Sequence, residues 1–179
     1  MKILVLNGSP RRNGNTVRLV SAFCKGATEA GNNVHIVNVA SQKIHGCIAC
    51  EYCHGAGNGT CVQQDDMQAL YPLIREADML VLASPIYYYT MTGQLISVLD
   101  RTYALGPLKH IKKTALILSS GAPNMYEAAI TQYKGVVSWW GAEDAGIFTV
   151  PGITRSHDLE NTPPENIEQL YQFGKNLTA

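Results

Sequence analysis

The stretch KILVLNGSPRRNGNT, residues 2–16, decides the fold class of this 179-residue chain. Its first six residues form a short apolar run that Gly8, Ser9 and Pro10 stop, which is typical of a buried strand. Directly after it, apolar residues recur at spacings of three and four between positions 16 and 30, which predicts a helix. A strand, a polar turn and a helix therefore follow one another at the start of the chain.

The same alternation continues along the rest of the sequence. Further strands are expected at 34–39, 78–84, 114–119 and 144–150, and further helices at 93–103, 124–140 and 164–177. Near-continuous apolar strands separated by helices imply a parallel sheet that is covered on both faces. We therefore predict one α/β domain over residues 1–179, a three-layer α/β/α sandwich with a five-stranded parallel sheet. A Cys- and Gly-bearing insertion at about 40–63 is the one long loop, and loops of that length are uncommon unless functional.

Composition limits the partners. Lys plus Arg number 14 and Asp plus Glu number 14, so the chain lacks the cationic field that nucleic acid demands. No apolar run approaches the roughly 20 residues that span a bilayer, and the apolar start is too short for a signal-peptide core. We expect a cytoplasmic protein with no nucleic-acid or membrane partner, whose five cysteines form no structural disulfides.

The turn after the first strand has the properties of an anion site. Its polar side chains are Ser9, Arg11, Arg12, Asn13, Asn15 and Thr16. Gly8 and Gly14 allow a ligand to approach the backbone closely, and the following helix presents free N–H groups and a positive dipole end. Five residues rather than four separate these glycines, and Asn15 replaces the lysine of a Walker A loop; a G-x-G-x-x-G fingerprint is absent. The turn suits one terminal phosphate, and the alternative is an ordinary capped turn.

Two later loops would lie at the same edge of the sheet. The loop after the third predicted strand is Ser84-Pro85-Ile86-Tyr87-Tyr88-Tyr89-Thr90. Three consecutive tyrosines cannot all point into a core, whereas their faces would suit a flat ring system; packing beneath the next helix is the alternative. After the fourth strand, Ser119-Ser120-Gly121 would form a third wall by position, or only a plain turn.

Four cysteines follow the pattern C-x2-C-x2-C-x7-C at Cys47, Cys50, Cys53 and Cys61. Bacterial ferredoxins hold a cubane cluster with a similar run, while four thiolates can also bind zinc, and thiols can remain free of metal. His45 and His54 flank the cysteines and are further candidate ligands. The fifth cysteine, Cys24, lies on the apolar stripe of the first helix and is expected in the core.

The first two loops resemble those of the flavodoxin-like NAD(P)H-dependent FMN reductases, in the phosphate loop and in Ser84-Pro85-Ile86-Tyr87, Gly93 and Asp100-Arg101. The resemblance implies a flavodoxin-like fold and FMN. It makes the turn at 9–16 the phosphate site and places 85–90 and 119–121 around the isoalloxazine ring. The implied cofactor-binding residues are Ser9, Arg11, Arg12, Asn13, Gly14, Asn15, Thr16, Pro85, Ile86, Tyr87, Tyr88, Tyr89, Thr90, Ser119, Ser120 and Gly121. Asp100 and Arg101 are expected to form an ion pair near a helix end.

The four cysteines, with Gln64-Asp65-Asp66-Met67 after them, resemble the iron–sulfur flavoproteins, which add a [4Fe–4S] cluster to FMN. This resemblance implies an oxidoreductase that passes electrons between NAD(P)H or a ferredoxin-like donor, FMN, a cluster on the four cysteines and an acceptor. A cluster-free NAD(P)H:FMN or quinone reductase is the alternative, and a non-catalytic electron-transfer or redox-sensing flavoprotein is another. Asp65 and Asp66 are expected to cap a helix that starts near Met67. We also expect a homodimer or homotetramer.

Overall fold

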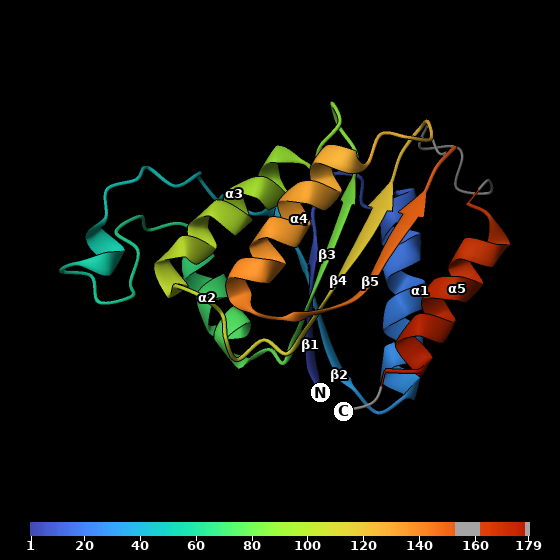
Figure 1. The fold of residues 1–179 in the computed structure, drawn as a ribbon, viewed down its shortest axis with the longest axis horizontal. Helices are drawn as coiled ribbons and strands as arrows, with labels where there is room; N and C mark the ends of the chain where they lie inside the picture. Colours follow the sequence, from blue (N-terminus) through green and yellow to red (C-terminus); the bar gives the residue numbers. More distant parts are fainter. Residues whose placement is uncertain (153–161, 178–179) are drawn as a thin grey trace.

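A computed structural model describes residues 1–152 and 162–177 of the chain (Figure 1). All five strands pair in parallel in one sheet of order β2-β1-β3-β4-β5, which confirms the predicted flavodoxin-like α/β fold. The strands are β1 (Lys2–Asn7), β2 (Asn33–Asn38), β3 (Met79–Pro85), β4 (Lys113–Ser119) and β5 (Glu143–Val150). Within the part of the chain that the structure describes, no helix has both the length and the hydropathy of a membrane-spanning segment.

Helices cover both faces of the sheet. Figure 1 shows α1 (Asn15–Glu29) and α5 (Pro164–Lys175) on one face, and α2 (Met67–Glu76), α3 (Gly93–Arg101) and α4 (Glu127–Trp140) on the other. Three short 3₁₀ helices complete the described elements: η1 (Val39–Ser41), η2 (Tyr52–His54) and η3 (Thr102–Leu105). The helices predicted at 93–103, 124–140 and 164–177 are present, although η3 takes over after Arg101 and α4 begins three residues later than expected.

The alternation of side chains along the strands divides the core into two layers. In β3, Leu80 and Leu82 pack into the cluster on the α2, α3 and α4 side, while Met79 and Val81 pack on the α1 and α5 side. Cys24 is buried in the second layer, as predicted. A central strand buried on both faces explains why the sequence of β3 shows a continuous apolar run rather than alternation.

Glycines bring α1 and α5 into close contact. A Cβ atom at Gly26 would collide with the backbone carbonyl of Tyr171, and one at Gly174 would collide with that of Phe23. The rings of Phe23 and Phe173 lie 5.6 Å apart beside this crossing. The two helices thus form one closely packed layer beneath the sheet.

The strand order reverses between β1 and β3, and ligands of such folds bind at that point. Gly8 ends β1 there. Its N–H donates to the carbonyl of Ala83 at 2.8 Å, and its own carbonyl accepts from Thr92 Oγ1 at 2.9 Å. A Cβ atom at Gly8 would lie 2.6 Å from Thr92 Oγ1, so only glycine lets the loop leave the sheet at this place. The loop at 9–14, which is expected to bind a phosphate, is therefore positioned by the packing of β1, β3 and α3.

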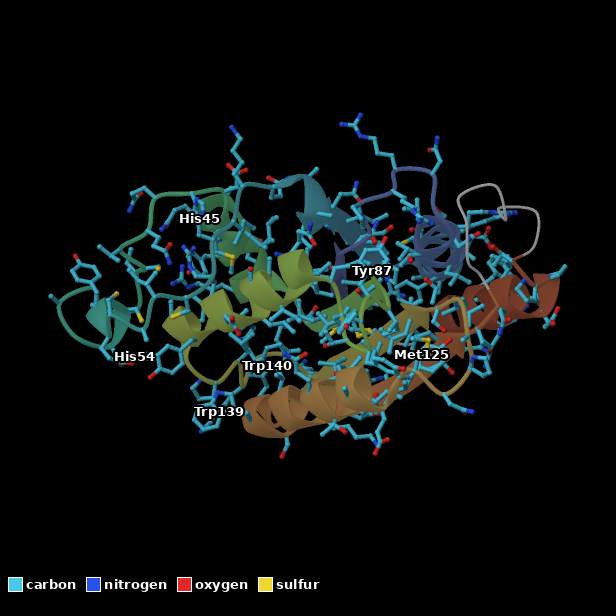
Figure 2. All side chains as sticks on the ribbon, turned by 90° about the horizontal axis from the view of Figure 1, so that it is seen from above. His45, His54, Tyr87, Met125, Trp139 and Trp140 are labelled. Carbon is cyan, nitrogen blue, oxygen red and sulfur yellow. The ribbon has the colours of Figure 1, made fainter. Side chains whose placement is uncertain are left out.

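The cysteine segment lies outside the three layers. The chain between η1 and α2 leaves the sheet and extends past α2 and α3 at one end of the molecule (Figure 1). Viewed from above, His45 and His54 lie at that end, whereas Tyr87 lies near the middle (Figure 2). The predicted insertion is thus separate from the carboxyl edge of the sheet.

Candidate functional site

A hollow of about 260 Å³ opens at the switch point, beyond the carboxyl ends of β1, β3 and β4. Its lining residues are Ser9, Arg11, Gly14, Asn15, Thr16, Pro85, Ile86, Tyr87, Ser119, Ser120 and Gly121. Each of them belongs to the predicted cofactor-binding set. The three loops that the sequence assigned to one site therefore do meet around one hollow.

The loop after β1 leads into a helix start without a side-chain cap. α1 begins at Asn15, and Gly14 in the N-cap position has no side chain with which to satisfy the first N–H groups. A Cβ atom at Gly14 would lie 2.9 Å from Arg11 Cβ, so a side chain there would crowd the turn. Thr16 Oγ1 lies 2.8 Å from Ser119 Oγ, a buried contact that joins the loops after β1 and β4. Free N–H groups, hydroxyls and the exposed Arg11 form a cradle for an anion.

One residue that supports this cradle could not be found from the sequence. Thr162 Oγ1 donates to Asn15 Oδ1 at 2.8 Å, and both side chains are buried. Thr162 precedes α5 and lies 147 positions from Asn15, with no motif around it. The bond fixes the side-chain carbonyl of Asn15, so its amide nitrogen is the group that can donate to a ligand.

The tyrosine loop is a tight turn in an uncommon conformation. Tyr87 and Thr90 exchange backbone hydrogen bonds at 3.0 and 3.3 Å, and the two residues between them, Tyr88 and Tyr89, have φ of 54° and 71°. Positive φ at both central positions defines a type I′ turn, which normally uses Asn or Gly. Non-glycine residues held in this region are strained, and such strain clusters at functional sites.

The turn separates the three tyrosines. Tyr87 lines the hollow, whereas Tyr88 is 98% exposed and Tyr89 is 59% exposed at the tip. Of the three tyrosines, Tyr87 is the one positioned to flank a ring in this hollow, and the contact itself stays a prediction. Thr90 also lies outside the lining, and so do the exposed Arg12 and Asn13; Arg12 lines a neighbouring hollow with Asn38 and Ser41.

The lining of the hollow suits the chemistry of FMN. The uncapped start of α1 and the hydroxyls beside it suit a phosphate, and the wall of Pro85, Ile86 and Tyr87 suits a flat aromatic ring. Ile86 N–H donates to the carbonyl of Ser119 at 2.7 Å, which holds this wall against the loop after β4. Ser119 therefore contacts both halves of the site: its hydroxyl meets Thr16 on the polar side, and its carbonyl accepts from Ile86 on the apolar side.

All four cysteines of the segment line a second hollow, which shares no residue with the first. Cys47 and Cys50 are exposed, Cys53 is half-buried and Cys61 is buried. Burial raises the pKa of the Cys53 thiol, and the nearby Cys61 and Glu51 raise it further, against a backbone hydrogen bond that lowers it. Among the described residues, no three His, Cys, Asp or Glu side chains converge tightly enough to hold a single metal ion.

A backbone N–H group of the cysteine segment is directed at a cysteine sulfur. Ala49 N–H donates to Cys47 Sγ at 3.4 Å, and Ala49 and Glu51 both have positive φ, at 51° and 55°. Turns that alternate between right- and left-handed conformation direct N–H groups into one concavity, as in many phosphate and iron–sulfur sites. The flanking His54 is engaged elsewhere, because its Nε2 lies 2.9 Å from the carbonyl of Tyr103.

A buried ion pair ties the cysteine segment to the body of the protein. Arg101 pairs with Asp65, at 2.7 Å between Nη1 and Oδ2 and 3.1 Å between Nη2 and Oδ1, with the side chains 1% and 7% exposed. The predicted pair of Arg101 with Asp100 is wrong. Adjacent residues on a helix point in directions about 100° apart, so Arg101 points inward while Asp100 is exposed.

Asp65 also caps α2, as predicted, because Met67 N–H donates to Asp65 Oδ1 at 3.1 Å. Asp66 does not cap this helix; its carboxylate accepts from Lys43 N–H at 2.7 Å instead. Burial alone would raise the pKa of Asp65, but hydrogen bonds from Arg101, His45 and Met67 hold it below its usual value. Asp65 is therefore ionised and shared between the ion pair, the helix start and the cysteine segment.

The fold and the first hollow define a flavodoxin-like, mononucleotide-binding protein. The family model that describes NADPH-dependent FMN reductases matches residues 1–153. The chain belongs to this family and is an FMN-dependent oxidoreductase. The resemblance inferred from the phosphate and tyrosine loops is thereby confirmed.

The second resemblance, to the iron–sulfur flavoproteins, is also found in comparisons with curated relatives. An iron–sulfur flavoprotein from Archaeoglobus fulgidus is 32% identical over 167 residues, which cover 89% of this chain and 74% of that protein. An iron–sulfur flavoprotein from Methanocaldococcus jannaschii is 32% identical over 105 residues, 59% of this chain and 53% of the relative. The match to this relative and to several others spans about half of their length.

Solved structures show the same fold. An NAD(P)H:quinone oxidoreductase from Methanothermobacter marburgensis superimposes with a TM-score of 0.81 at 18% identity, over 100% of this chain and 96% of that one. An azoreductase from Bacillus anthracis superimposes with a TM-score of 0.73 at 17% identity, over 99% and 100% of the two chains. At these identities the likeness concerns architecture alone.

Proposed function

We propose that this oxidoreductase is of the iron–sulfur flavoprotein type, with FMN at the switch-point hollow and a [4Fe–4S] cluster on Cys47, Cys50, Cys53 and Cys61. Electrons would enter from NAD(P)H or a ferredoxin-like donor and leave to a small-molecule or protein acceptor. The observation that carries the proposal is that all four cysteines line one hollow, in a chain that is similar to proteins named iron–sulfur flavoproteins.

The donor set fits a cluster. A cubane binds each thiolate at a separate corner, and four cysteines line the hollow, three of them at the C-x2-C-x2-C spacing that bacterial ferredoxins use. The amide donor to Cys47 Sγ and the left-handed turns at Ala49 and Glu51 are also features that favour charged sulfur.

The chain's own residues have distinct tasks at the flavin hollow. FMN, when bound, accepts electrons in pairs or singly, and the protein supplies binding, orientation and electrostatics. The start of α1, Thr16 and Arg11 would hold the phosphate. The wall formed by Pro85, Ile86 and Tyr87 would exclude water from one side of the ring. The tip of the tyrosine turn stands outside this wall, where it can meet a donor or acceptor.

Anaerobic reconstitution tests the cluster. We expect the chain, purified without oxygen and incubated with iron and sulfide, to bind about four of each per chain and to gain a broad absorbance shoulder beside the flavin bands. Cys50→Ser is expected to lose most of the bound iron, because it removes one thiolate of the set. Iron and sulfide assays with the visible spectrum provide the measurement.

Cys24→Ala is the matched control, since burial raises the pKa of the Cys24 thiol to about 12 and removes it from metal chemistry. This variant should keep the same iron content as the unaltered chain. Absence of iron from the unaltered chain after reconstitution would contradict the proposal. It would favour the second candidate, a cluster-free NAD(P)H:FMN or quinone reductase. The exposure of the Cys47 and Cys50 side chains is the observation that supports this candidate.

We also propose that the active form is a homodimer or a homotetramer. The two hollows share no residue, and the cysteine segment lies at one end of the molecule in both views (Figures 1 and 2). A second copy could bring a cysteine segment near a flavin that its own chain does not approach. Light scattering is expected to give a mass at least twice 19.5 kDa, and a monomeric mass would refute the proposal.

A further inference from the structure

Arg101 has one donor without a partner. Its Nη1 and Nη2 are occupied by Asp65 and by the carbonyl of His45, which accepts from Nη1 at 3.0 Å. Its Nε is the one buried side-chain nitrogen or oxygen, among the residues the structure describes, for which no partner is found. Leaving a charged donor buried and unpaired costs more free energy than leaving a neutral one so, and such a donor calls for an explanation.

Arg101 also lines the hollow of the four cysteines. It is held there from three sides, by the fork to Asp65, by His45 next to the segment, and by α3, in whose last turn it lies. Tyr71 donates to the backbone carbonyl of Arg101 at 3.1 Å, and its hydroxyl also lies close to the Arg101 guanidinium and to the Cys61 thiol. A side chain fixed in this way loses little freedom when its remaining donor finds an acceptor.

We infer that Arg101 is a positioning residue for the cluster and that its Nε–H donates to a sulfur of the cluster or of its cysteine ligands. The inference rests on the proposed function. Thiolate and sulfide are the acceptors that the hollow would offer, and hydrogen bonds to cluster sulfurs are among the features that set the reduction potential. Such a hydrogen bond favours the reduced cluster and slows its loss.

The test compares two double variants, Asp65→Asn/Arg101→Gln and Asp65→Asn/Arg101→Met. Both remove the ion pair together, which avoids leaving one buried charge alone. Glutamine places an amide nitrogen where arginine has Nε, whereas methionine places a methyl group there. The two variants thus differ in the donor at that atom and agree in the loss of charge.

We expect the methionine variant to release iron to a chelator about tenfold faster than the glutamine variant. We also expect its one-electron reduction to be about tenfold less favourable, which is about 59 mV lower in potential. Anaerobic redox titration and the rate of iron release measure these effects. Equal FMN affinity of both variants shows that the fold is intact. Equal potentials and release rates, or loss of the cluster from both variants, would overturn the inference.

A measurement on the unaltered chain does not depend on any variant folding. With ¹⁵N-labelled arginine as the only labelled residue, the pulsed electron paramagnetic resonance spectrum of the reduced cluster should show a ¹⁵N coupling from a hydrogen-bonded guanidinium. A cluster with four iron atoms but no such coupling would overturn the role of Arg101 and leave the proposed function standing. A chain that takes up no iron would overturn both.

Discussion

Replacing both Asn15 and Thr16 with alanine is expected to weaken FMN binding by about 100-fold or more. A hydrogen bond to a charged group contributes about 1.5–3 kcal/mol, and each 1.4 kcal/mol is tenfold in affinity. The double substitution removes the Asn15 amide and the Thr16 hydroxyl, which lie at the open start of α1 and line the hollow. Quenching of flavin fluorescence on titration of the chain with FMN measures the dissociation constant.

Riboflavin separates a lost phosphate contact from a damaged fold. It carries the same ring without the phosphate, so its affinity should change by less than threefold in the double variant. Ser21→Ala is a control on the same helix, because Ser21 is exposed and donates only to the carbonyl of Val17. Thr162→Val removes the bond to Asn15 Oδ1 while leaving every residue that lines the hollow unchanged in identity. An unchanged FMN affinity in the double variant would place the phosphate at another site.

Much of the fold was predictable because its signals are local. The apolar strands and the apolar stripes of the helices identify the layers. Because the strands are parallel, their carboxyl ends lie at one edge of the sheet, and the polar turn after β1 identifies that edge as the ligand-binding one. Trp139 and Trp140 show the limit of such signals. The two residues are adjacent at the end of α4, yet Trp140 is buried while Trp139 is exposed.

The unpredicted parts of the site depend on contacts between distant segments. Arg101 contacts Asp65 because the cysteine segment folds back against α3, and no sequence motif near Arg101 predicts this contact. Thr162 reaches Asn15 across the whole domain. The tyrosine turn adopts positive φ although its central residues lack the usual Asn or Gly, so local propensity argues against the observed conformation. Conflicts of this kind are expected at functional or strained sites.

Asp65→Asn is expected to lower the free energy of unfolding by about 3–5 kcal/mol, because it leaves the Arg101 charge buried without its partner. The substitution keeps the shape of the side chain, so cavity formation makes no contribution. Asp66→Asn is the matched control, since Asp66 is exposed and its amide oxygen can still accept from Lys43 N–H; we expect a change below about 0.5 kcal/mol. Urea unfolding of the metal-free chain at pH 7 measures both.

The pH dependence identifies the ionised carboxylate as the source of the effect. The folded-state pKa of Asp65 lies below its unfolded value of about 3.9, so its contribution is fully present above that value. It is lost as the pH falls through the lower, folded-state pKa, where the wild-type carboxylate also becomes neutral. The difference in unfolding free energy between the wild type and Asp65→Asn should therefore shrink between about pH 5 and pH 2. A difference that stays constant over this range would mean that hydrogen bonding, rather than charge, holds the cysteine segment to α3.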